Sequence, residues 1–309
     1  MEVLMLRKPI LALTSDRTRM AQTNDFCGNP EDWFDSQPFR ENNLYATSFD
    51  FFVDWEANRV CDEVWIKRIS DSDAIHQQGE TELLELISNC DGREESNRLY
   101  RFMAYQHLIE KYMLFRDVPE ERWEAGEEKV VELDMSRFRN GSVSQLDINE
   151  IQQRISQLRR RPAPIGNAGL VYSTSSLEGY LSRKPYFWPG DADTVLFDEN
   201  NDVVAIIEFK KHTASSRIPF SEQRISNYLN RDILKYKSLA LLRDKFQSNL
   251  YVLYYPIPRN IDYVIVEKLD GTVDALYASQ RFELNLPDYR RNDSIRAFAN
   301  AFITNVLGR

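Results

Sequence analysis

The stretch from Asp191 to Lys211, DADTVLFDENNDVVAIIEFKK, constrains the fold of this chain more than any other segment. Two apolar runs flank the very polar patch DENND, a pattern that is typical of a β-hairpin. Ionisable side chains nevertheless stand within or beside those runs, at Asp191, Asp193, Glu208 and Lys210. Buried strands tolerate charges only when these are paired or bind a metal, so the hairpin needs partners or a ligand for them.

The register of this hairpin predicts which charges meet. A turn over the two asparagines of DENND places Asp193 opposite Glu208 and Asp191 opposite Lys210, all on one side of the sheet. Opposed side chains have Cβ atoms ~4.5–5.5 Å apart. Two carboxylates that close repel unless a cation lies between them, and oxygen ligands around an open position suit Mg²⁺ or Mn²⁺. The alternative is a surface hairpin with an ordinary ion pair between Asp191 and Lys210.

A lysine on the same face indicates which chemistry the expected metal site would serve. Lys210 follows Glu208 by two residues. A structural metal site gains little from a neighbouring positive charge, whereas hydrolysis of a phosphodiester gains from both groups. The metal lowers the pKa of a bound water and takes up charge on the phosphate. The lysine stabilises the extra negative charge of the transition state.

The combination of Asp193 with Glu208-Phe209-Lys210 resembles the motif of the PD-(D/E)xK nuclease superfamily, over about residues 170–255. The resemblance implies a restriction-endonuclease-like αβββαβ core in the C-terminal half. It also implies a divalent-metal phosphodiesterase, an (endo)nuclease, with DNA favoured over RNA as substrate. By position, Asp193 and Glu208 are the expected metal ligands and Lys210 the expected catalytic lysine.

Several features depart from or extend that motif. Many members add an acid from the first core helix, and Glu178 in SSLEGYL is the match here. The usual proline stands before Asp191 rather than Asp193, which makes Asp191 a competitor for the ligand role. Gln223 and Tyr228 in QRISNY are one residue further apart than the Gln-x-x-x-Tyr pattern of a recombination-related subset, so membership of that subset is left open.

Residues downstream of the motif are candidates for contact with nucleic acid. The segment FSEQRISNYLNRDILKYKSLALLRDKF predicts one long helix, which carries a basic stripe at Arg224, Tyr228, Arg231 and Lys235. Such a stripe is either a solvated helix face or a track for a phosphate backbone. Lys211 and His212 end the second strand of the hairpin, and His212 is in phase with Glu208 and Lys210.

A helix and a linker divide the chain into two predicted domains. DINEIQQRISQLRRR has helical spacing with Asp147 and Glu150 in a capping-box arrangement, and PAPIGNAG follows as a linker. We therefore expect a mixed α+β N-terminal domain over residues 1–161 and the nuclease-like domain over residues 162–309. Within the first, FDFFVDW and DEVWIKRI predict strands, and SNRLYRFMAYQHLIEKYMLF predicts one long helix.

Charge separates the two halves. The first 160 residues carry 20 Lys and Arg against 31 Asp and Glu, and the rest carry 19 against 17. The acidic half is expected to contact protein or a second copy of the chain rather than nucleic acid.

No apolar run approaches the ~20 residues of a membrane span. The three cysteines are far apart and in no metal-ligand spacing, so the expected location is the cytoplasm. The predicted function is a metal-dependent nuclease; the alternative is a catalytically inactive nuclease-like protein that binds nucleic acid or a partner.

Overall fold

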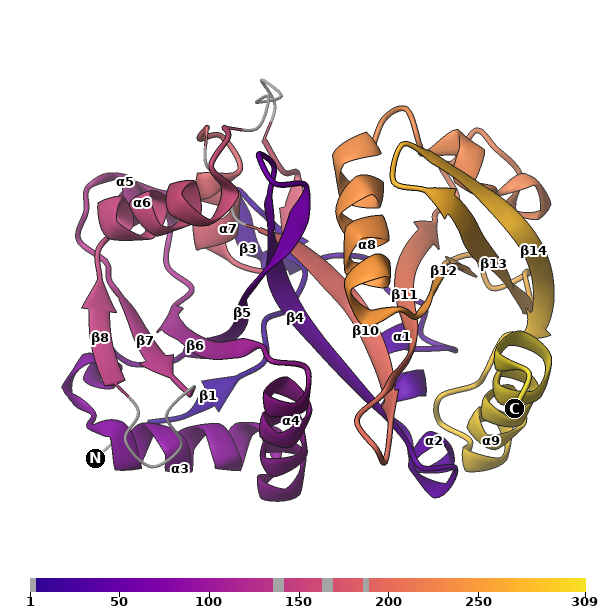
Figure 1. The fold of residues 1–309 in the computed structure, drawn as a ribbon, viewed down its shortest axis with the longest axis horizontal. Helices are drawn as coiled ribbons and strands as arrows, with labels where there is room; N and C mark the ends of the chain where they lie inside the picture. Colours follow the sequence, from indigo (N-terminus) through magenta and orange to yellow (C-terminus); the bar gives the residue numbers. More distant parts are fainter. Residues whose placement is uncertain (1–3, 136–141, 163–168, 186–188) are drawn as a thin grey trace. The chain divides into compact units, whose positions relative to one another are not determined.

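The computed structural model describes residues 4–135, 142–162, 169–185 and 189–309. Two compact units make up the chain, and each mixes helices with a sheet (Figure 1). Unit 1 comprises residues 1–21 and 49–190, and unit 2 comprises residues 22–48 and 191–309. The α/β class expected from the sequence is confirmed.

The elements of unit 1 are short strands at its start, a meander of longer strands, and helices between them. They are β1 (Leu6–Arg7), β2 (Ala12–Leu13), β3 (Asp16–Met20), β4 (Leu44–Asp54, which begins in unit 2), β5 (Arg59–Ser70), η1 (Asp73–Gln77), α3 (Glu80–Asp91), α4 (Arg93–Tyr105), β6 (Ile109–Arg116), α5 (Glu120–Glu124), β7 (Val130–Asp134), β8 (Ser142–Leu146), α6 (Ile148–Arg159), β9 (Tyr172–Ser173) and α7 (Ser176–Leu181).

Unit 2 contains two early helices and then the C-terminal part of the chain. Its elements are α1 (Pro30–Phe34), α2 (Gln37–Glu41), β10 (Gly190–Asp198, whose first residue belongs to unit 1), β11 (Val203–His212), η2 (Phe220–Glu222), η3 (Ile225–Asn227), α8 (Ile233–Phe246), β12 (Asn249–Pro256), β13 (Tyr263–Thr272), β14 (Ala275–Asn285), α9 (Asn292–Ala301) and the π-helix η4 (Phe302–Leu307).

The two units share one strand order. In unit 2, β10 pairs antiparallel with β11, β11 parallel with β12, and β12, β13 and β14 continue antiparallel. In unit 1, β4 to β8 repeat the same sequence of orientations. A parallel pair needs a crossover connection. The crossover contains α8 in unit 2 and α3 and α4 in unit 1, and each strand set is followed by a helix, α9 or α6.

The expected boundary between residues 161 and 162 differs from the two units, because the segments before β4 and before β10 pack elsewhere. The aromatic residues of α1 and α2 join the core of unit 2, where the Phe34 and Phe302 rings lie 4.9 Å apart and the Trp33 and Phe298 rings 5.3 Å apart. The helix α7 instead buries Leu177 and Leu181 in the core of unit 1. Of the expected linker, residues 163–168 lie outside the described residues.

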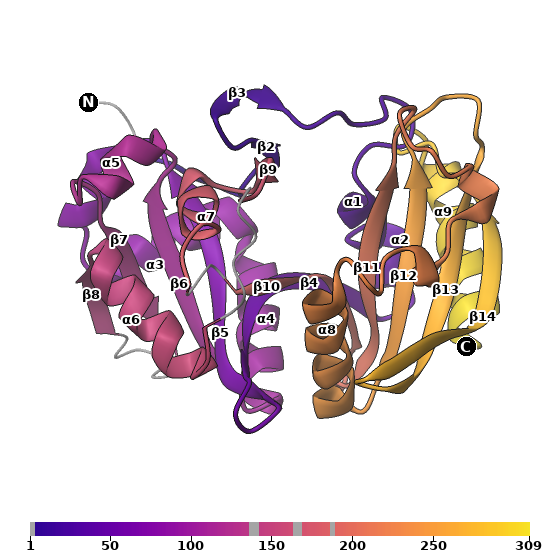
Figure 2. The ribbon, with the colours of Figure 1, turned by 90° about the horizontal axis from the view of Figure 1, so that it is seen from above.

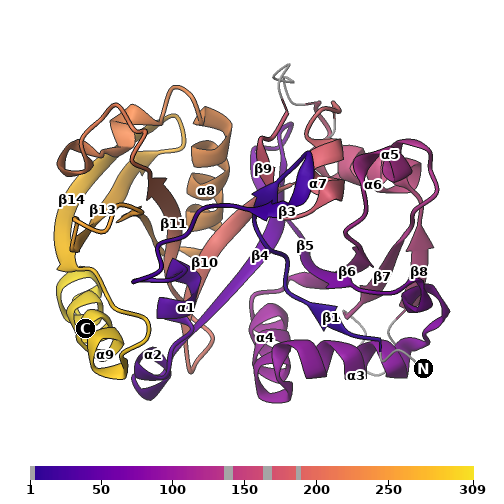
Figure 3. The ribbon, with the colours of Figure 1, turned by 180° about the vertical axis from the view of Figure 1, so that it is seen from behind.

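Each sheet of the two units is covered on both faces. In unit 2, α1, α2 and α9 cover the face that carries Ile207 and Phe209, and α8 lies over the other face (Figures 1 and 3). In unit 1, α6 and α4 lie on opposite sides of the strands (Figure 2). Residues that alternate along β11 therefore face either an aromatic core or α8.

The long helix predicted over residues 220–246 is wrong in its first half, because α8 begins at Ile233. Tertiary hydrogen bonds occupy the backbone before that point. The buried carboxylate of Glu267 on β13 accepts the backbone N–H of Ile225 at 2.7 Å, and the Arg281 side chain donates to the carbonyls of Gln223 and Ser221 at 2.7 and 2.9 Å. These bonds replace the helical pairing that an isolated segment would favour.

The helix predicted over residues 96–115 is likewise too long. The helix α4 ends at Tyr105, and Ile109–Arg116 forms β6, which pairs in parallel with β5. Strands buried on both faces are continuously apolar, so their sequence lacks the alternation that separates a strand from a helix.

Glu267 should be a strong stabiliser of the segment before α8. Its side chain also accepts the Tyr254 hydroxyl and pairs with Arg281 at 3.0 Å. We expect Glu267→Ala to lower the free energy of unfolding by about 3 kcal/mol, since it strands buried donors and a cation. Urea unfolding measures this change. Glu283→Ala, at an exposed position of β14, is the control and should change stability by less than about 0.5 kcal/mol; equal effects of the two would contradict the assignment.

Unit 1 contains a buried acid on the face covered by its crossover helices. Glu110 on β6 is 3% exposed. Burial and then the charge of Asp91 raise the pKa of this carboxyl to about 8, while Arg68 acts in the opposite direction. The folded protein therefore holds a proton on Glu110 that the unfolded chain loses at lower pH.

This difference predicts a pH dependence with a defined sign. The stability that comes from the protonated carboxyl is fully present below the ordinary Glu pKa of about 4.3 and is lost as the pH rises to about 8. Glu110→Gln keeps a neutral side chain and should lack that loss. Thermal unfolding between pH 4.5 and pH 9, an approximate window set by these pKa values, compares the two proteins; parallel curves would contradict the prediction.

Candidate metal site on the β10–β11 hairpin

The hairpin has the register that the sequence predicts. Thr194 lies opposite Ile207 and Val195 opposite Ile206, so the next opposed residues are Asp193 and Glu208. An irregularity between Leu196 and Phe197 shifts the pairing only near the turn. The Asp193 carboxylate accepts the backbone N–H of Phe209 at 2.7 Å, which holds it against β11.

Glu208 is the most deeply buried member of the site. It is 1% exposed, and its Oε2 accepts no hydrogen bond from any described residue. Two ammonium groups approach Oε1 instead, with the Lys235 Nζ at 2.8 Å and the Lys210 Nζ at 3.1 Å. An oxygen atom of a buried carboxylate that has no donor is costly, so Oε2 is left as an acceptor for a further cation.

Asp193 responds to the same crowding. Burial, followed by the nearby charge of Glu208, raises the pKa of Asp193 well above its usual range. Burial and the neighbouring acid thus make an ionised Asp193 costly at this position. A divalent cation would relieve both the burial of charge and the repulsion.

Lys210 is held by aromatic rings and by a second acid. Its Nζ lies 5.4 Å from the centre of the Tyr228 ring and 5.3 Å from that of Tyr236, distances at which an ammonium is attracted to an aromatic face. It also pairs with Asp232 at 3.3 Å. Burial alone would raise the pKa of Asp232, but hydrogen bonding from Arg231 and the charge of Lys210 lower it.

Lys235 and Asp191 complete the cluster, in a different pairing from the one expected. Lys235, in the first turn of α8, pairs with Asp191 at 3.3 Å as well as with Glu208. Burial would lower the pKa of Lys235, but the charges of Asp191 and Glu208 raise it well above its ordinary value. The ion pair considered between Asp191 and Lys210 is replaced by these contacts.

The predicted basic stripe does not form a helix face. Arg224 and Tyr228 precede α8, Arg231 is also outside it, and only Lys235 is helical. Arg224 and Arg231 are exposed, and Arg231 pairs with Asp232 at 3.0 Å. The Tyr228 hydroxyl donates a hydrogen bond to the Gln223 side chain at 2.5 Å. The two side chains therefore meet although they are five residues apart, one more than in a helical i, i+4 pair.

Lys211 and His212, the last two residues of β11, are both engaged by other parts of unit 2. Lys211 donates to the carbonyl of Gln22 at 3.1 Å, and burial lowers its pKa. His212 is 8% exposed, its ring packs against Phe220 with centroids 5.2 Å apart, and burial lowers its pKa. His212 does not present an exposed ring in this structure, because its strand end is covered by residues 218–223.

Glu178 does not join the cluster within unit 2. It belongs to α7 of unit 1, where its carboxylate accepts the backbone N–H of Thr174 at 2.8 Å and lies 3.8 Å from the Lys67 ammonium. The helix that precedes β10 packs on unit 1, and the expected ligand role of Glu178 stays a prediction. It follows that the described acids of the unit 2 site are Asp191, Asp193, Glu208 and Asp232.

A second group of metal-type ligands occurs in unit 1. Single ligand atoms of Asp73, His76 and Glu128 lie within 4.8 Å of one another. Arg116 pairs with both acids, at 2.9 Å from Asp73 and 2.8 Å from Glu128, and Arg122 lies 2.7 Å from Glu128. The guanidinium groups pair with both carboxylates, and the hairpin differs in that Oε2 of Glu208 accepts no hydrogen bond from any described residue.

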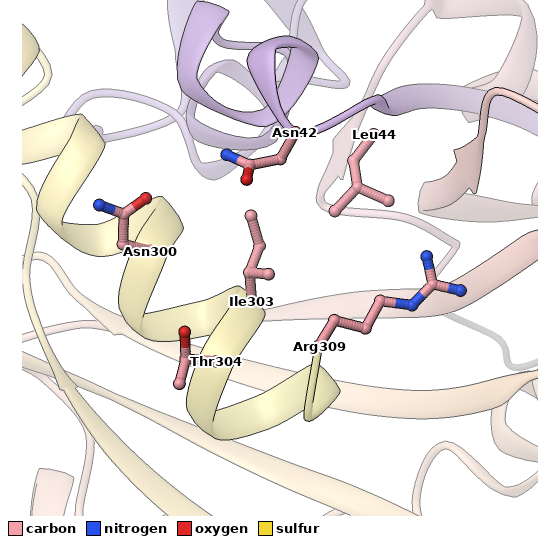
Figure 4. A pocket seen from close by; sticks show the side chains of 6 residues that line it. All are labelled: Asn42, Leu44, Asn300, Ile303, Thr304 and Arg309. Atoms are coloured by element: carbon pink, nitrogen blue, oxygen red, sulfur yellow. The ribbon is translucent and has the colours of Figure 1, made fainter.

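Unit 2 also contains a cavity of about 250 Å³ on other elements (Figure 4). It is lined by Asn42, Leu44, Asn300, Ile303, Thr304 and Arg309. None of these is a carboxylate, so the cavity has no ligands of the kind that Mg²⁺ or Mn²⁺ prefers.

Sequence reasoning missed the roles of Asp232 and Tyr236 and misassigned that of Lys235. The i, i+3 spacing of Asp232 and Lys235 becomes informative only once the start of α8 is known.

Comparison of the chain with protein-family models, curated proteins and solved structures returned no match. Among the described residues, no helix combines the length and apolar character needed to cross a membrane.

Asp193 and Glu208 present opposed carboxylates, which are ligands of the kind that a divalent cation prefers. We expect Mn²⁺ to bind the wild type, with Asp193→Ala abolishing binding and Asp191→Ala weakening it less, since Asp193 lies opposite Glu208. Isothermal titration calorimetry measures the three affinities. Asp274→Ala, at an exposed acid that pairs with Lys237, is the control. Equal Mn²⁺ binding by Asp193→Ala and the wild type would contradict the ligand assignment.

Proposed function

We propose that unit 2 is a divalent-metal-dependent nuclease that hydrolyses phosphodiester bonds in nucleic acid. The observation that carries the proposal is the buried Glu208 carboxylate beside Asp193 on one sheet face, with the Lys210 ammonium 3.1 Å from it. Two carboxylates repel a negatively charged phosphodiester. They would favour its binding only with a metal cation between them and the phosphate.

The order of elements in unit 2 supports the resemblance to the PD-(D/E)xK superfamily. The helices α1 and α2, the first residues of β4, then β10, β11, α8 and β12 follow one another as helix, three strands, helix and strand once the body of unit 1 is set aside. The strands β4, β10, β11 and β12 are neighbours in that order. The proposal therefore assigns the first core helix to α1 and α2 rather than to α7.

In this proposal each side chain has a distinct task. Asp193 and Glu208 would hold Mg²⁺ or Mn²⁺, with Asp191 at their edge. The cation, when bound, would polarise a phosphate oxygen and lower the pKa of a water molecule. Lys210, fixed between two tyrosine rings and Asp232, keeps a positive charge where the transition state gains negative charge.

DNA is the favoured substrate because the superfamily that the motif resembles usually acts on DNA. Unit 2 contains 17 Lys and Arg against 21 Asp and Glu, so net charge does not attract nucleic acid to it. Local contacts have to provide the attraction. Arg224 and Arg231, exposed just before α8, are proposed to contact the phosphate backbone.

A second candidate function follows from Lys235, whose ammonium already lies against Glu208. If that contact is permanent, unit 2 is a metal-free module that binds nucleic acid or a partner without cutting. Cleavage assays with Mn²⁺ on single- and double-stranded DNA and RNA separate the two functions. Cleavage that EDTA abolishes supports the nuclease, and binding without cleavage under every condition supports the module.

Lys210→Met tests the catalytic role of the lysine directly. We expect the cleavage rate to fall by about 10²–10³-fold, while substrate affinity changes far less, because the lysine acts on the transition state. Single-turnover kinetics and fluorescence anisotropy measure rate and affinity. Lys237→Met, on the outer part of α8 where Lys237 pairs with Asp274, is the control. A Lys210→Met protein that cuts at the wild-type rate would show that Lys210 only balances charge.

A further inference from the structure

The Lys235 ammonium lies where a cation between carboxylates is expected. Its Nζ is 2.8 Å from the Glu208 carboxylate and 3.3 Å from that of Asp191. The Lys235 side chain is 31% exposed, whereas Glu208 is almost fully buried. A single ammonium thus joins two acids at the open edge of the site, and Glu208 Oε2 still lacks a donor among the described residues.

Unit 1 also has an ion pair between a crossover helix and its sheet, with the acid on the helix and the cation on the strand. There Arg68 on β5 holds Asp91 at the end of α3 through two hydrogen bonds, of 2.6 and 2.8 Å. The Tyr112 hydroxyl donates to the same carboxylate at 3.2 Å, and the Arg68 and Asp91 side chains are only 12% and 6% exposed. The Arg68–Asp91 pair is therefore bidentate, and both carboxylate oxygens of Asp91 accept hydrogen bonds.

The contact in unit 2 differs in each of those respects. Lys235 offers one compact ammonium on a flexible four-carbon chain, in place of a planar fork. Its single charge is shared between the carboxylates of Asp191 and Glu208, and Asp193 lies opposite Glu208. A divalent cation carries twice its charge and accepts several oxygen ligands at once.

We propose that Lys235 is an internal counter-ion that a divalent cation displaces. Before the metal binds, its ammonium holds Glu208 and Asp191 together and keeps α8 on β11. When the metal binds, the ammonium leaves Glu208 and moves toward solvent. This inference rests on the proposed metal site, and it adds a competition between a residue of the chain and the metal.

Lys235→Gln tests the competition because it removes the charge and keeps a polar side chain. Without the competing ammonium, Mn²⁺ should bind roughly tenfold more tightly than to the wild type. Without its counter-ion, the metal-free protein should unfold at a lower temperature. The two changes have opposite signs, whereas ordinary structural damage would weaken both metal binding and stability.

Two further variants complete the experiment. Lys235→Arg keeps the charge and offers the bidentate fork seen in unit 1, so it should bind Mn²⁺ more weakly than the wild type. Lys237→Gln, on the same helix and with a side chain 30% exposed, should change neither quantity. Calorimetry with Mn²⁺ alone and thermal unfolding with and without Mn²⁺ provide the readouts.

The outcomes separate this inference from the proposed function. Tighter Mn²⁺ binding by Lys235→Gln supports displacement, also when the wild type itself binds too weakly to measure. Unchanged or weaker binding by Lys235→Gln, in a wild type that binds Mn²⁺ and cleaves DNA, overturns displacement and leaves the nuclease intact. No Mn²⁺ binding by any of the four proteins overturns both. Should Lys235→Gln fail to fold, wild-type affinity in Lys235→Arg overturns displacement.

Discussion

The carboxylate of Glu208, buried opposite Asp193, is the constraint on which the rest of unit 2 depends. Burying an ionised acid costs several kcal/mol unless charges and hydrogen bonds compensate. Here the compensation comes from separate elements, through the ammonium groups of Lys210 on β11 and Lys235 on α8. The helix α8 is therefore placed by electrostatics as well as by its buried residues, and any change at Glu208 acts on both the site and the packing of that helix.

The parts of the fold that sequence predicted are those set by local rules. The hairpin register follows from two apolar runs joined by a short polar turn, and the structure pairs Thr194 with Ile207 as that turn predicts. The capping box of Asp147 and Glu150 at the start of α6 is a local motif in the same sense. In both cases the residues that decide the structure are close neighbours along the chain, so no distant contact could overrule them.

The parts that sequence did not predict depend on distant partners. The start of α8 is decided by Glu267 and Arg281, which take the backbone groups of residues 221–225. Assignment of the first core helix is decided by which core the aromatic side chains of α1 and the leucines of α7 enter. Lys235 was expected to contact phosphate, whereas the structure pairs it with Asp191 and Glu208. The reason is the same, because the face of α8 on which Lys235 lies depends on where the helix begins.

The shared strand order of the two units allows the ion pairs between strand and crossover helix to be compared. Both place a strand residue against the crossover helix through an ion pair, but Arg68 is the strand residue in unit 1 and Glu208 in unit 2. The strand arginine and the helix aspartate of unit 1 form a bidentate pair in which the two charges neutralise each other. A strand acid with a helix lysine leaves oxygen atoms unsatisfied. The sign of the charge on the strand residue therefore goes with a difference in hydrogen bonding: Asp91 accepts three side-chain hydrogen bonds, whereas Oε2 of Glu208 has no donor among the described residues.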